Sequence, residues 1–332
     1  MSQPGRVSLT VAMSDYDHVR DFASGLVRAE GIDATFLTLP VEEIFFRFTR
    51  FREWDVSELS MGKYVSLVSQ DDTSLVAIPV FPSRIFRQSS IYVRRDGPVK
   101  ALTDLKGRRV GLPEWAQTAA IYTRGFLMHD CGIRLQEIEW HQAGVNQPGR
   151  VEKVQLRLPE GVRYLPRPDR SLDGMLLAGE VDAIMSAHPP QAFERGDPQI
   201  VRLLPEYRRI EEEYWRKTGI FPIMHTVALR RDVFDRHPWA AMNLFKAFEE
   251  AKRRSVARML DSTAPRVPIP WCFAHADDAR ALFGEDFWPY GIEGNRVTLE
   301  AYLRFAHEQG VCHRPVRVEE LFPRELAATF KI

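Results

Sequence analysis

The chain has 332 residues, of which 45% are hydrophobic and 27% are charged, and its 45 basic residues balance its 45 acidic ones. This length suits roughly two domains of about 150 residues each, and the composition is that of an ordinary soluble globular protein. A formal net charge of zero argues against a nucleic-acid-binding protein and against a protein held at membranes by a polybasic stripe.

The first residues contain a short apolar run that Ser14, Asp15 and Asp17 soon interrupt. They lack the longer apolar core and the cleavage site of a secretory signal. No window approaches the ~18 apolar residues that a membrane-spanning helix needs. The three cysteines are too few and too scattered for a disulfide framework or a zinc site. We therefore expect a cytoplasmic protein that is not associated with a membrane.

Short strands and helices alternate from the start of the chain. The expected elements are a strand over 6–13, a helix over 17–31, a strand over 33–39, a helix over 41–50, a strand feeding a helix within 55–68, and a strand over 75–80. The helix over 41–50 places Glu42 and Glu43 in its first turn, where the helix dipole favours acidic side chains. This order is typical of a parallel, doubly wound α/β sheet.

A second α/β unit begins near Asp96. It should contain a strand over 109–112, a helix ending at Gly132, a strand over 137–144, loops over the proline-rich residues 147–171, and a helix and buried strand within 172–187. The chain then returns to the first unit with a strand within 219–234 and a long helix that has Pro238 in its first turn. We expect two lobes, one made of 1–94 with 202–332 and the other of 95–201, joined by two hinge crossings.

Such an arrangement makes the cleft between the lobes the expected ligand site. The carboxyl ends of parallel strands and the first turns of helices meet there, and their unpaired N–H groups attract anions. Two-lobe proteins with hinges close on their ligand at this place.

Several long strings resemble known sequences. "DLKGRRVGLPE" and "GEVDAI" resemble the type 2 periplasmic-binding-protein fold. "LPVEEIFFR", "IPVFPSRIFRQSSIYV", "GIFPIMHTVALRRDV", "DFWPYGIEGNR" and "LEAYLRFAHEQG" resemble the 4,5-dihydroxyphthalate decarboxylase family, and they are spread from residue 39 to residue 310. The resemblance implies a cytoplasmic enzyme that converts 4,5-dihydroxyphthalate to 3,4-dihydroxybenzoate and CO₂. One departure is His188, at a position where the family often carries an arginine.

The reaction that the resemblance implies sets chemical requirements. The substrate is an aromatic dicarboxylate, so its site needs cationic or N–H-rich groups for two carboxylates and a flat apolar slot. Loss of CO₂ requires protonation of the ring carbon, with a hydroxyl para to it supplying electrons. No redox cofactor is needed. The histidines show no HxH or HExxH spacing, so no metal ligands are assigned, although the sequence leaves a divalent metal open.

Arg84 and Arg87 lie in the apolar segment 78–93 and are the first candidates for carboxylate binding. Buried arginines are normally paired, and bonds from a guanidinium to a carboxylate are strong. Both side chains can converge only if Pro82 and Ser83 break the strand. The structural alternative is that one arginine pairs with an acid such as Glu43 or Glu58.

The segment "LPEWAQTAA", 112–120, places Gln117 and Thr118 at the start of a helix that follows a strand. Its N–H groups could cradle a carboxylate. Glu114 could act as an acid or base, and Trp115 could stack on the substrate ring. The alternative is ordinary helix capping and a tryptophan on the surface.

Further candidates come from isolated polar residues. His225, inside an apolar strand, is a candidate proton donor or base, although such histidines are often hydrogen-bonded core residues. His188 ends a strand of the other lobe and could face it across the cleft. Loop residues expected at the ligand are Asp15, Ser60 and Lys63. Asp17 directly precedes the first helix and is better explained as its cap.

The leading interpretation is therefore a cofactor-independent carboxy-lyase acting on a small aromatic dicarboxylate. A solute-binding protein that holds an aromatic carboxylate without reacting is the alternative. A different enzyme on the same scaffold, similar to chorismate dehydratase, is a third possibility. The chain has no nucleophile elbow and no glycine-rich phosphate loop, which argues against hydrolase, kinase and dehydrogenase chemistry. The number of subunits is left open, with a homo-oligomer possible.

Overall fold

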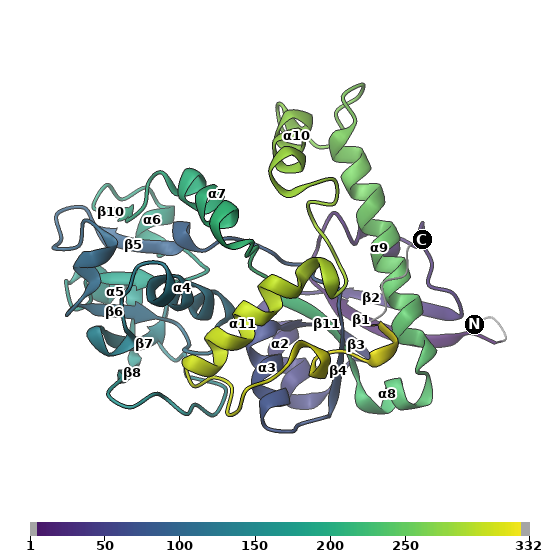
Figure 1. The fold of residues 1–332 in the computed structure, drawn as a ribbon, viewed down its shortest axis with the longest axis horizontal. Coiled ribbons are helices and arrows are strands. Elements are labelled where there is room, and N and C mark those ends of the chain that lie inside the picture. The colour runs from purple at the N-terminus through teal and green to yellow at the C-terminus, as the bar shows by residue number, and fades with distance from the viewer. Residues whose placement is uncertain (1–4, 327–332) are drawn as a thin grey trace.

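Two α/β lobes lie side by side in the computed structural model, which describes residues 5–326 (Figure 1). Lobe 1 is built on a five-stranded sheet in the order β2-β1-β3-β11-β4. Its strands are β1 (Val7–Met13), β2 (Ile32–Thr38), β3 (Val56–Ser60), β4 (Leu75–Ile78) and β11 (His225–Arg230). Strand β1 is parallel to β2 and β3, whereas β11 inserts antiparallel between β3 and β4.

Lobe 2 is built on a six-stranded sheet in the order β10-β5-β9-β6-β7-β8. Its strands are β5 (Ile91–Arg94), β6 (Arg109–Leu112), β7 (Glu139–Gly144), β8 (Arg163–Ser171), β9 (Ala183–Met185) and β10 (Ile200–Arg202). Strand β6 is parallel to β7 and β9, while β5 is antiparallel to β9 and β10. The predicted strand over 109–112 is confirmed residue for residue.

Helices cover both sheets. They are α1 (Arg20–Ala23), α2 (Val41–Phe51), α3 (Met61–Ser69), α4 (Thr118–His129), α5 (Leu172–Leu177), α6 (Gln191–Glu194), α7 (Tyr207–Thr218), α8 (Arg231–Arg236), α9 (Trp239–Leu260), α10 (Cys272–Phe283) and α11 (Arg296–Glu308). Short 3₁₀ turns are η1 (Gln88–Ser90), η2 (Leu102–Leu105), η3 (Leu135–Glu137), η4 (Glu293–Asn295), η5 (Val318–Glu320) and η6 (Arg324–Leu326). Within residues 5–326, no helix is both long and apolar enough to cross a membrane.

Helix α11 joins the lobes and runs across the middle of the molecule in Figure 1, in contact with α3 of lobe 1 and α4 of lobe 2. Tyr122 of α4 stacks on Tyr302 of α11 with ring centroids 4.7 Å apart. Gly125 of α4 lets Phe305 approach closely, because a Cβ on this glycine would lie 2.4 Å from the phenylalanine ring. This contact is tightly packed and holds α4 of lobe 2 against α11.

The predicted lobe boundaries need correction at both crossings. Strand β5 belongs to the second sheet, so the first crossing precedes Ile91 and does not fall near residue 94. The second crossing follows α7 and not residue 202, because α7 packs on lobe 2. Tyr214 of α7 packs edge-on against Phe126 of α4, and Lys217 bonds to Asp130 at 2.8 Å. The sheet membership of β5 therefore moves the first boundary, and the contacts of α7 move the second.

Two local predictions were also wrong. The helix expected over 17–31 is confined to Arg20–Ala23, because Gly25 adopts a left-handed conformation with φ of +79° and the chain turns there. Residues 147–171, which were expected to form loops, contain β8, an edge strand whose neighbour in the described sheet is β7. Pro166 and Pro168 fit there because an edge strand has a row of N–H groups that need no partner.

Candidate active site

A cavity of about 350 Å³ opens between the lobes. Its polar lining consists of Tyr16, Glu42, Ser60, Lys63 and His225 from lobe 1, Ser83 and Arg87 from the first crossing, and Glu114, Gln117, Thr118, Arg150 and His188 from lobe 2. Phe45 and Met224 are among its apolar walls. The cavity therefore gathers most of the predicted site residues from distant parts of the sequence.

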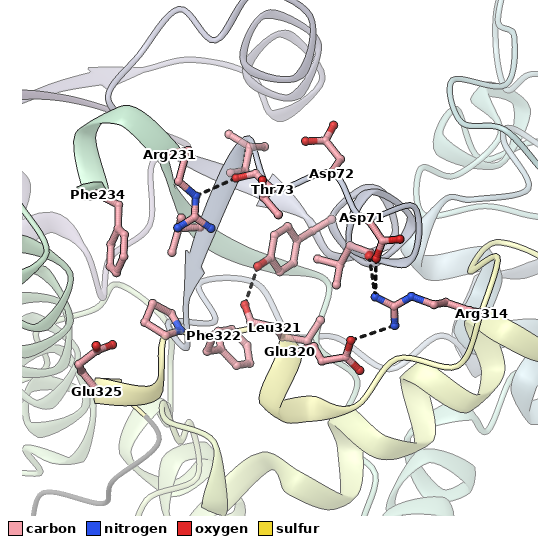
Figure 2. Close-up of a pocket in the computed structure, with 15 residues that line it drawn as sticks. Asp71, Asp72, Thr73, Arg231, Phe234, Arg314, Glu320, Leu321, Phe322 and Glu325 are labelled. Carbon is pink, nitrogen blue, oxygen red and sulfur yellow. Dashed lines mark hydrogen bonds and ion pairs between the residues drawn. The ribbon is translucent and has the colours of Figure 1, made fainter. Parts of the chain in front are cut away.

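A second pocket of about 340 Å³, shown in Figure 2, lies beside residues 314–325. Its arginines are already engaged by the protein. Arg314 pairs with Asp71 and Glu320, each at 2.9 Å, and Arg231 donates to the carbonyl of Thr73 at 2.9 Å. Because acidic residues neutralise Arg314, this pocket does not offer the unpaired positive charge that a carboxylate ligand needs.

The first turn of α4 faces the cavity with its N–H groups available. Gln117 is the N-cap residue and its side chain forms no capping bond. Among the described residues, no partner is found for the N–H groups of Thr118 and Ala119, and both residues line the cavity. Free N–H groups and the helix dipole favour an anion at this position. The prediction of a carboxylate cradle here stays a proposal, and the geometry supports it.

Thr118 and Ser60 connect the lobes. The Thr118 hydroxyl oxygen accepts a hydrogen bond from the N–H of Gly62 at 3.0 Å and lies 3.1 Å from the Ser60 hydroxyl oxygen. Gly62 permits this approach, because a Cβ there would lie 2.3 Å from the carbonyl oxygen of Ala116. These two residues thus join the end of β3 to the start of α4, directly beside the cavity.

Lys63 and Arg87 are cations without an acidic partner. Neither forms an ion pair within residues 5–326, and the Nε of Arg87 donates only to the sulfur of Met224, at 3.3 Å. Burial lowers the pKa of Lys63 to about 8 and that of Arg87 to about 10. A buried charge without a partner is costly. Two such cations beside one cavity therefore indicate an anionic ligand.

Glu114 and Arg150 form a further charged group at the lobe 2 wall. Glu114 is 2% exposed and its carboxylate lies 2.8 Å from Arg150 and 3.2 Å from Lys153. Glu152 accepts hydrogen bonds from the N–H groups of Trp115 and Ala116, at 2.5 and 3.2 Å. Burial, with the charge of Glu114, raises the pKa of Glu152. Glu152 thus occupies the two N–H groups that directly precede the predicted carboxylate cradle.

His225 forms a hydrogen bond with the buried carboxylate of Glu58. Its Nδ1 is 2.6 Å from the Oε1 of Glu58, and the Tyr16 hydroxyl donates to the same oxygen at 2.6 Å. The N–H of Ser14 donates to Oε2 at 3.0 Å. Burial alone would raise the pKa of Glu58, but the bonds and charge of His225, with these donors, outweigh it and leave the pKa below its usual value. Burial, with the nearby Glu58, raises the pKa of Tyr16.

His188 of lobe 2 pairs with Glu42 of lobe 1 across the cavity mouth, with Nε2 and Oε1 2.7 Å apart. The hydrogen bond from His188 lowers the pKa of Glu42 to about 2, and the same bond raises the pKa of His188. Both side chains are partly exposed, at 60% and 44%. This contact bridges the two lobes at the solvent-facing edge of the cleft.

Three predicted ligand residues lie elsewhere. Arg84 is 6% exposed and points into lobe 1, where it donates to Asn295 and lies 4.9 Å from the ring centroid of Phe221. It reaches neither the cavity nor the acids Glu43 and Glu58 that the structural alternative named. The reason is the backbone: Arg84 bridges to Ile223, while Arg87, three residues on, turns toward the cavity.

Trp115 is fully buried behind the cavity wall and is not available to stack on a ligand. Its Nε1 donates to the carbonyl of Gln309 at 2.7 Å, and Arg124 lies 3.9 Å from its ring centroid. Asp15 is exposed and does not line the cavity. The capping role expected of Asp17 is also wrong, because α1 begins three residues later and Asp17 instead accepts from Ser255.

Glu58, Tyr16 and Arg150 were not among the predicted site residues. Glu58 is the acidic residue of β3, a strand whose five residues are all buried. An acidic residue within such an apolar strand was the sequence feature that could have identified it. Its partner His225 is 167 positions away, so the sequence could not identify the pair. Among the residues the structure describes, no group of three or more histidines, cysteines and acids is placed to hold a metal.

No protein-family model matches the sequence. Solved structures with a similar fold include the periplasmic aliphatic sulphonate binding protein SsuA from Escherichia coli, with a TM-score of 0.55 and 13% identity over 98% of this chain and 99% of that one. The desulfurization enzyme DSZB has a TM-score of 0.51 and 15% identity over 97% of this chain and 98% of its own. At such identities the likeness concerns the fold alone, and the predicted type 2 periplasmic-binding-protein-like fold is confirmed.

Curated relatives are closer in sequence. The 4,5-dihydroxyphthalate decarboxylase of Comamonas testosteroni is 36% identical over 328 residues, which is 98% of this chain and 99% of the relative. The 4,5-dihydroxyphthalate decarboxylase of Pseudomonas putida is 35% identical over 212 residues, 64% of this chain and 82% of the relative. The first of these matches covers 98% of this chain and therefore spans both lobes. The chain therefore belongs to the 4,5-dihydroxyphthalate decarboxylase family.

Proposed function

We propose that the cavity between the lobes binds 4,5-dihydroxyphthalate and releases 3,4-dihydroxybenzoate and CO₂. The family relationship over nearly the whole chain supports the reaction. The observation that carries the assignment to this cavity is a pair of cations, the buried Lys63 and the partly buried Arg87, which form no ion pair within residues 5–326. Its volume of about 350 Å³ falls in the usual range for a small-molecule site.

The two carboxylates have separate sets of candidate partners. Arg87 and Lys63 supply charge from the first crossing and lobe 1, and the first turn of α4 supplies N–H groups from lobe 2. Arg150, held by Glu114, adds a further guanidinium on the lobe 2 side. Binding of a dianion between these groups would draw the lobes together, because each lobe contributes some of the groups that attract its negative charge.

The reaction follows from the substrate's substitution pattern. Each ring carbon that bears a carboxylate is para to a hydroxyl. When that hydroxyl loses its proton, the ring carbon becomes basic and accepts a proton from the protein. The bond to the carboxylate then breaks, its electron pair restores the aromatic ring and the phenolate, and CO₂ leaves. The phenolate finally regains a proton, so that one proton has replaced one CO₂.

His225 is the proposed proton donor to the ring carbon. It lines the cavity and its Nδ1 is held by Glu58, so Nε2 is the nitrogen that can face a ligand. General acid catalysis by such a group typically contributes about 10²- to 10⁴-fold in rate. Glu114 and His188, which line the same cavity, are proposed to assist in moving the hydroxyl proton.

The direct test is to incubate the purified protein with 4,5-dihydroxyphthalate and follow 3,4-dihydroxybenzoate and CO₂. In D₂O, one deuterium should appear on the ring carbon that lost its carboxylate. Assays with and without a chelator test the expectation that no metal is required. Tight binding of the substrate without any product would contradict the proposal and favour a solute-binding protein.

A further inference from the structure

We propose that Glu58, assisted by Tyr16, is a positioning residue for His225. It holds the imidazole with Nδ1–H toward the core, leaves Nε2 for the ligand, and stabilises the protonated ring before it gives up its proton. This inference deepens the proposed function and rests on it, because it gives His225 a reason to be protonated and oriented at the start of each turnover.

Strand register places the two side chains together. His225 is directly opposite Ser60 in the antiparallel pair of β11 and β3. Side chains alternate between the faces of a strand, so Glu58 lies on the same face as Ser60, two residues away. It therefore reaches His225 as a diagonal neighbour, a position from which long side chains on adjacent strands interact.

The environment of Glu58 is that of a carboxylate held in its charged form. Its side chain is fully buried, and a buried carboxylate is stable only where donors surround it. Three donors do so: Ser14 N–H, the Tyr16 hydroxyl and His225 Nδ1. They come from the loop after β1 and from β11, so donors from two separate segments converge on one carboxylate.

The imidazole has one orientation that keeps these bonds. Rotating its ring would break the 2.6 Å contact between Nδ1 and Glu58. Phe45 of α2 packs edge-on against the ring with centroids 4.8 Å apart. Among residues 5–326, Nε2 has no hydrogen-bond partner, so it is the nitrogen free to exchange a proton with a ligand. A carboxylate that accepts a hydrogen bond from one ring nitrogen of a histidine fixes the proton on that nitrogen, which leaves the other nitrogen unprotonated in the neutral ring.

Charged groups from several elements line the cavity around His225. The titratable and charged groups that line its cavity are Tyr16 before α1, Glu42 of α2, Lys63 of α3, Arg87 of the first crossing, and Glu114, Arg150 and His188 of lobe 2. Lys63 and Arg87 are cations of this lining that form no ion pair within residues 5–326. Glu58 is the acid in direct contact with the ring, with Nδ1 and Oε1 2.6 Å apart.

The main test is Glu58→Gln, which keeps the shape and removes the charge. We expect kcat to fall by roughly 10²-fold or more, the range that general acid catalysis supplies, while KM changes little. The basic limb of the kcat–pH profile should move to lower pH, since the imidazolium has lost its counter-charge. Tyr16→Phe, which keeps the carboxylate, should lower kcat less and leave that limb in place.

The matched control is Asp55→Asn. Asp55 precedes β3, accepts from the N–H and hydroxyl of Thr10 at 2.8 Å each, and is remote from the cavity. It should retain wild-type kcat and pH profile, which shows that neutralising a hydrogen-bonded carboxylate of this sheet is not harmful in itself. Glu58→Gln with unchanged kcat and an unmoved limb would overturn the inference.

Nitrogen NMR of labelled histidine in the wild-type protein provides a second measurement if Glu58→Gln does not fold. With His225→Gln used for assignment, Nδ1 should carry the proton at high pH and Nε2 should titrate. A neutral ring protonated on Nε2 would overturn the inference. This measurement needs no turnover, so a protein that fails to decarboxylate the substrate would refute the proposed function without deciding the role of Glu58.

Discussion

Arg84 and Arg87 show how two residues of one type, three positions apart, acquire different environments. Arg84 enters the core of lobe 1, where it contacts Asn295 and the face of Phe221. Arg87 lines the cavity and contacts the sulfur of Met224. The unusual density of arginine in this apolar segment thus has two causes, a packed core contact and a ligand-facing charge.

Arg87→Met should raise KM for 4,5-dihydroxyphthalate by about 10- to 100-fold, since a hydrogen bond to a charged group is worth about 1.5–3 kcal/mol. Its effect on stability should be small or favourable, because it removes a partly buried charge. Arg84→Met is the matched control and should leave KM unchanged while altering the thermal unfolding midpoint. Steady-state kinetics and thermal denaturation of both variants check this, and the reverse pattern would reassign the carboxylate-binding arginine.

At the scale of elements, the site depends on how closely α3 approaches α4. The first residues of α3 carry Gly62 and Lys63, and Gly62 lies against the carbonyl of Ala116 just before α4. The same contact brings Ser60 to Thr118. A cation from one lobe and a helix N-terminus from the other are therefore held side by side by a position that has room only for glycine.

Gly62→Ala should separate these elements, because its Cβ would lie 2.3 Å from a backbone oxygen. We expect a loss of about 1–3 kcal/mol in the free energy of unfolding, the usual cost of overpacking, and a higher KM. Urea denaturation and kinetics give the two values. Gly294→Ala is the control, since its Cβ would make an ordinary contact of 3.4 Å with Pro289. Equal stabilities for the two variants would show that the approach of α3 to α4 is not tightly constrained.

On the scale of the whole molecule, two of the contacts between the lobes differ in character. Behind the cavity, α4 and α11 pack through buried aromatic rings, and Arg124 bonds to Gln309 at 2.8 Å. At its mouth, the contact is the exposed pair His188 and Glu42. We expect the buried contact to keep the lobes attached, and the exposed pair to be the contact that breaks if the cleft opens.

The contribution of this pair should depend on pH. Glu42 is ionised above its pKa of about 2, and the pKa of His188 is raised by the same hydrogen bond. The attraction is therefore fully present below the ordinary histidine pKa of about 6.5 and is lost as pH rises through the raised value. Glu42→Gln should weaken substrate binding by about 2- to 5-fold at low pH, as for an exposed ion pair, and have no effect at high pH.

Substrate dissociation constants of wild type and Glu42→Gln between pH 5 and 9 provide the measurement. Glu43→Gln is the control, because Glu43 lies next in the same helix turn but pairs with Arg47 at 2.6 Å and does not line the cavity. A constant difference between wild type and Glu42→Gln across this pH range would show that the pair does not contribute through the charge of His188.

The local pattern of the chain was sufficient to predict the α/β class, the two lobes, most strands and the position of several cavity residues. Hydrophobic periodicity, turn residues and helix-start residues are local signals that extend over a few positions. They can therefore be recognised in a single sequence. Gln117, Thr118 and Lys63 were found in this way, because each follows a strand at the edge where parallel strands end. The long strings around His225 also indicated the decarboxylase family, which the curated relatives confirm.

Contacts between distant segments could not be read in the same way. The direction of Arg84 depends on a bridge to Ile223, and the pairing of Glu58 with His225 depends on the register of β3 against β11. The burial of Trp115 depends on the docking of the segment around Gln309. Each is set by how strands align and lobes pack, and one residue of register would turn these side chains to the opposite face. Local sequence patterns carry no information about that alignment.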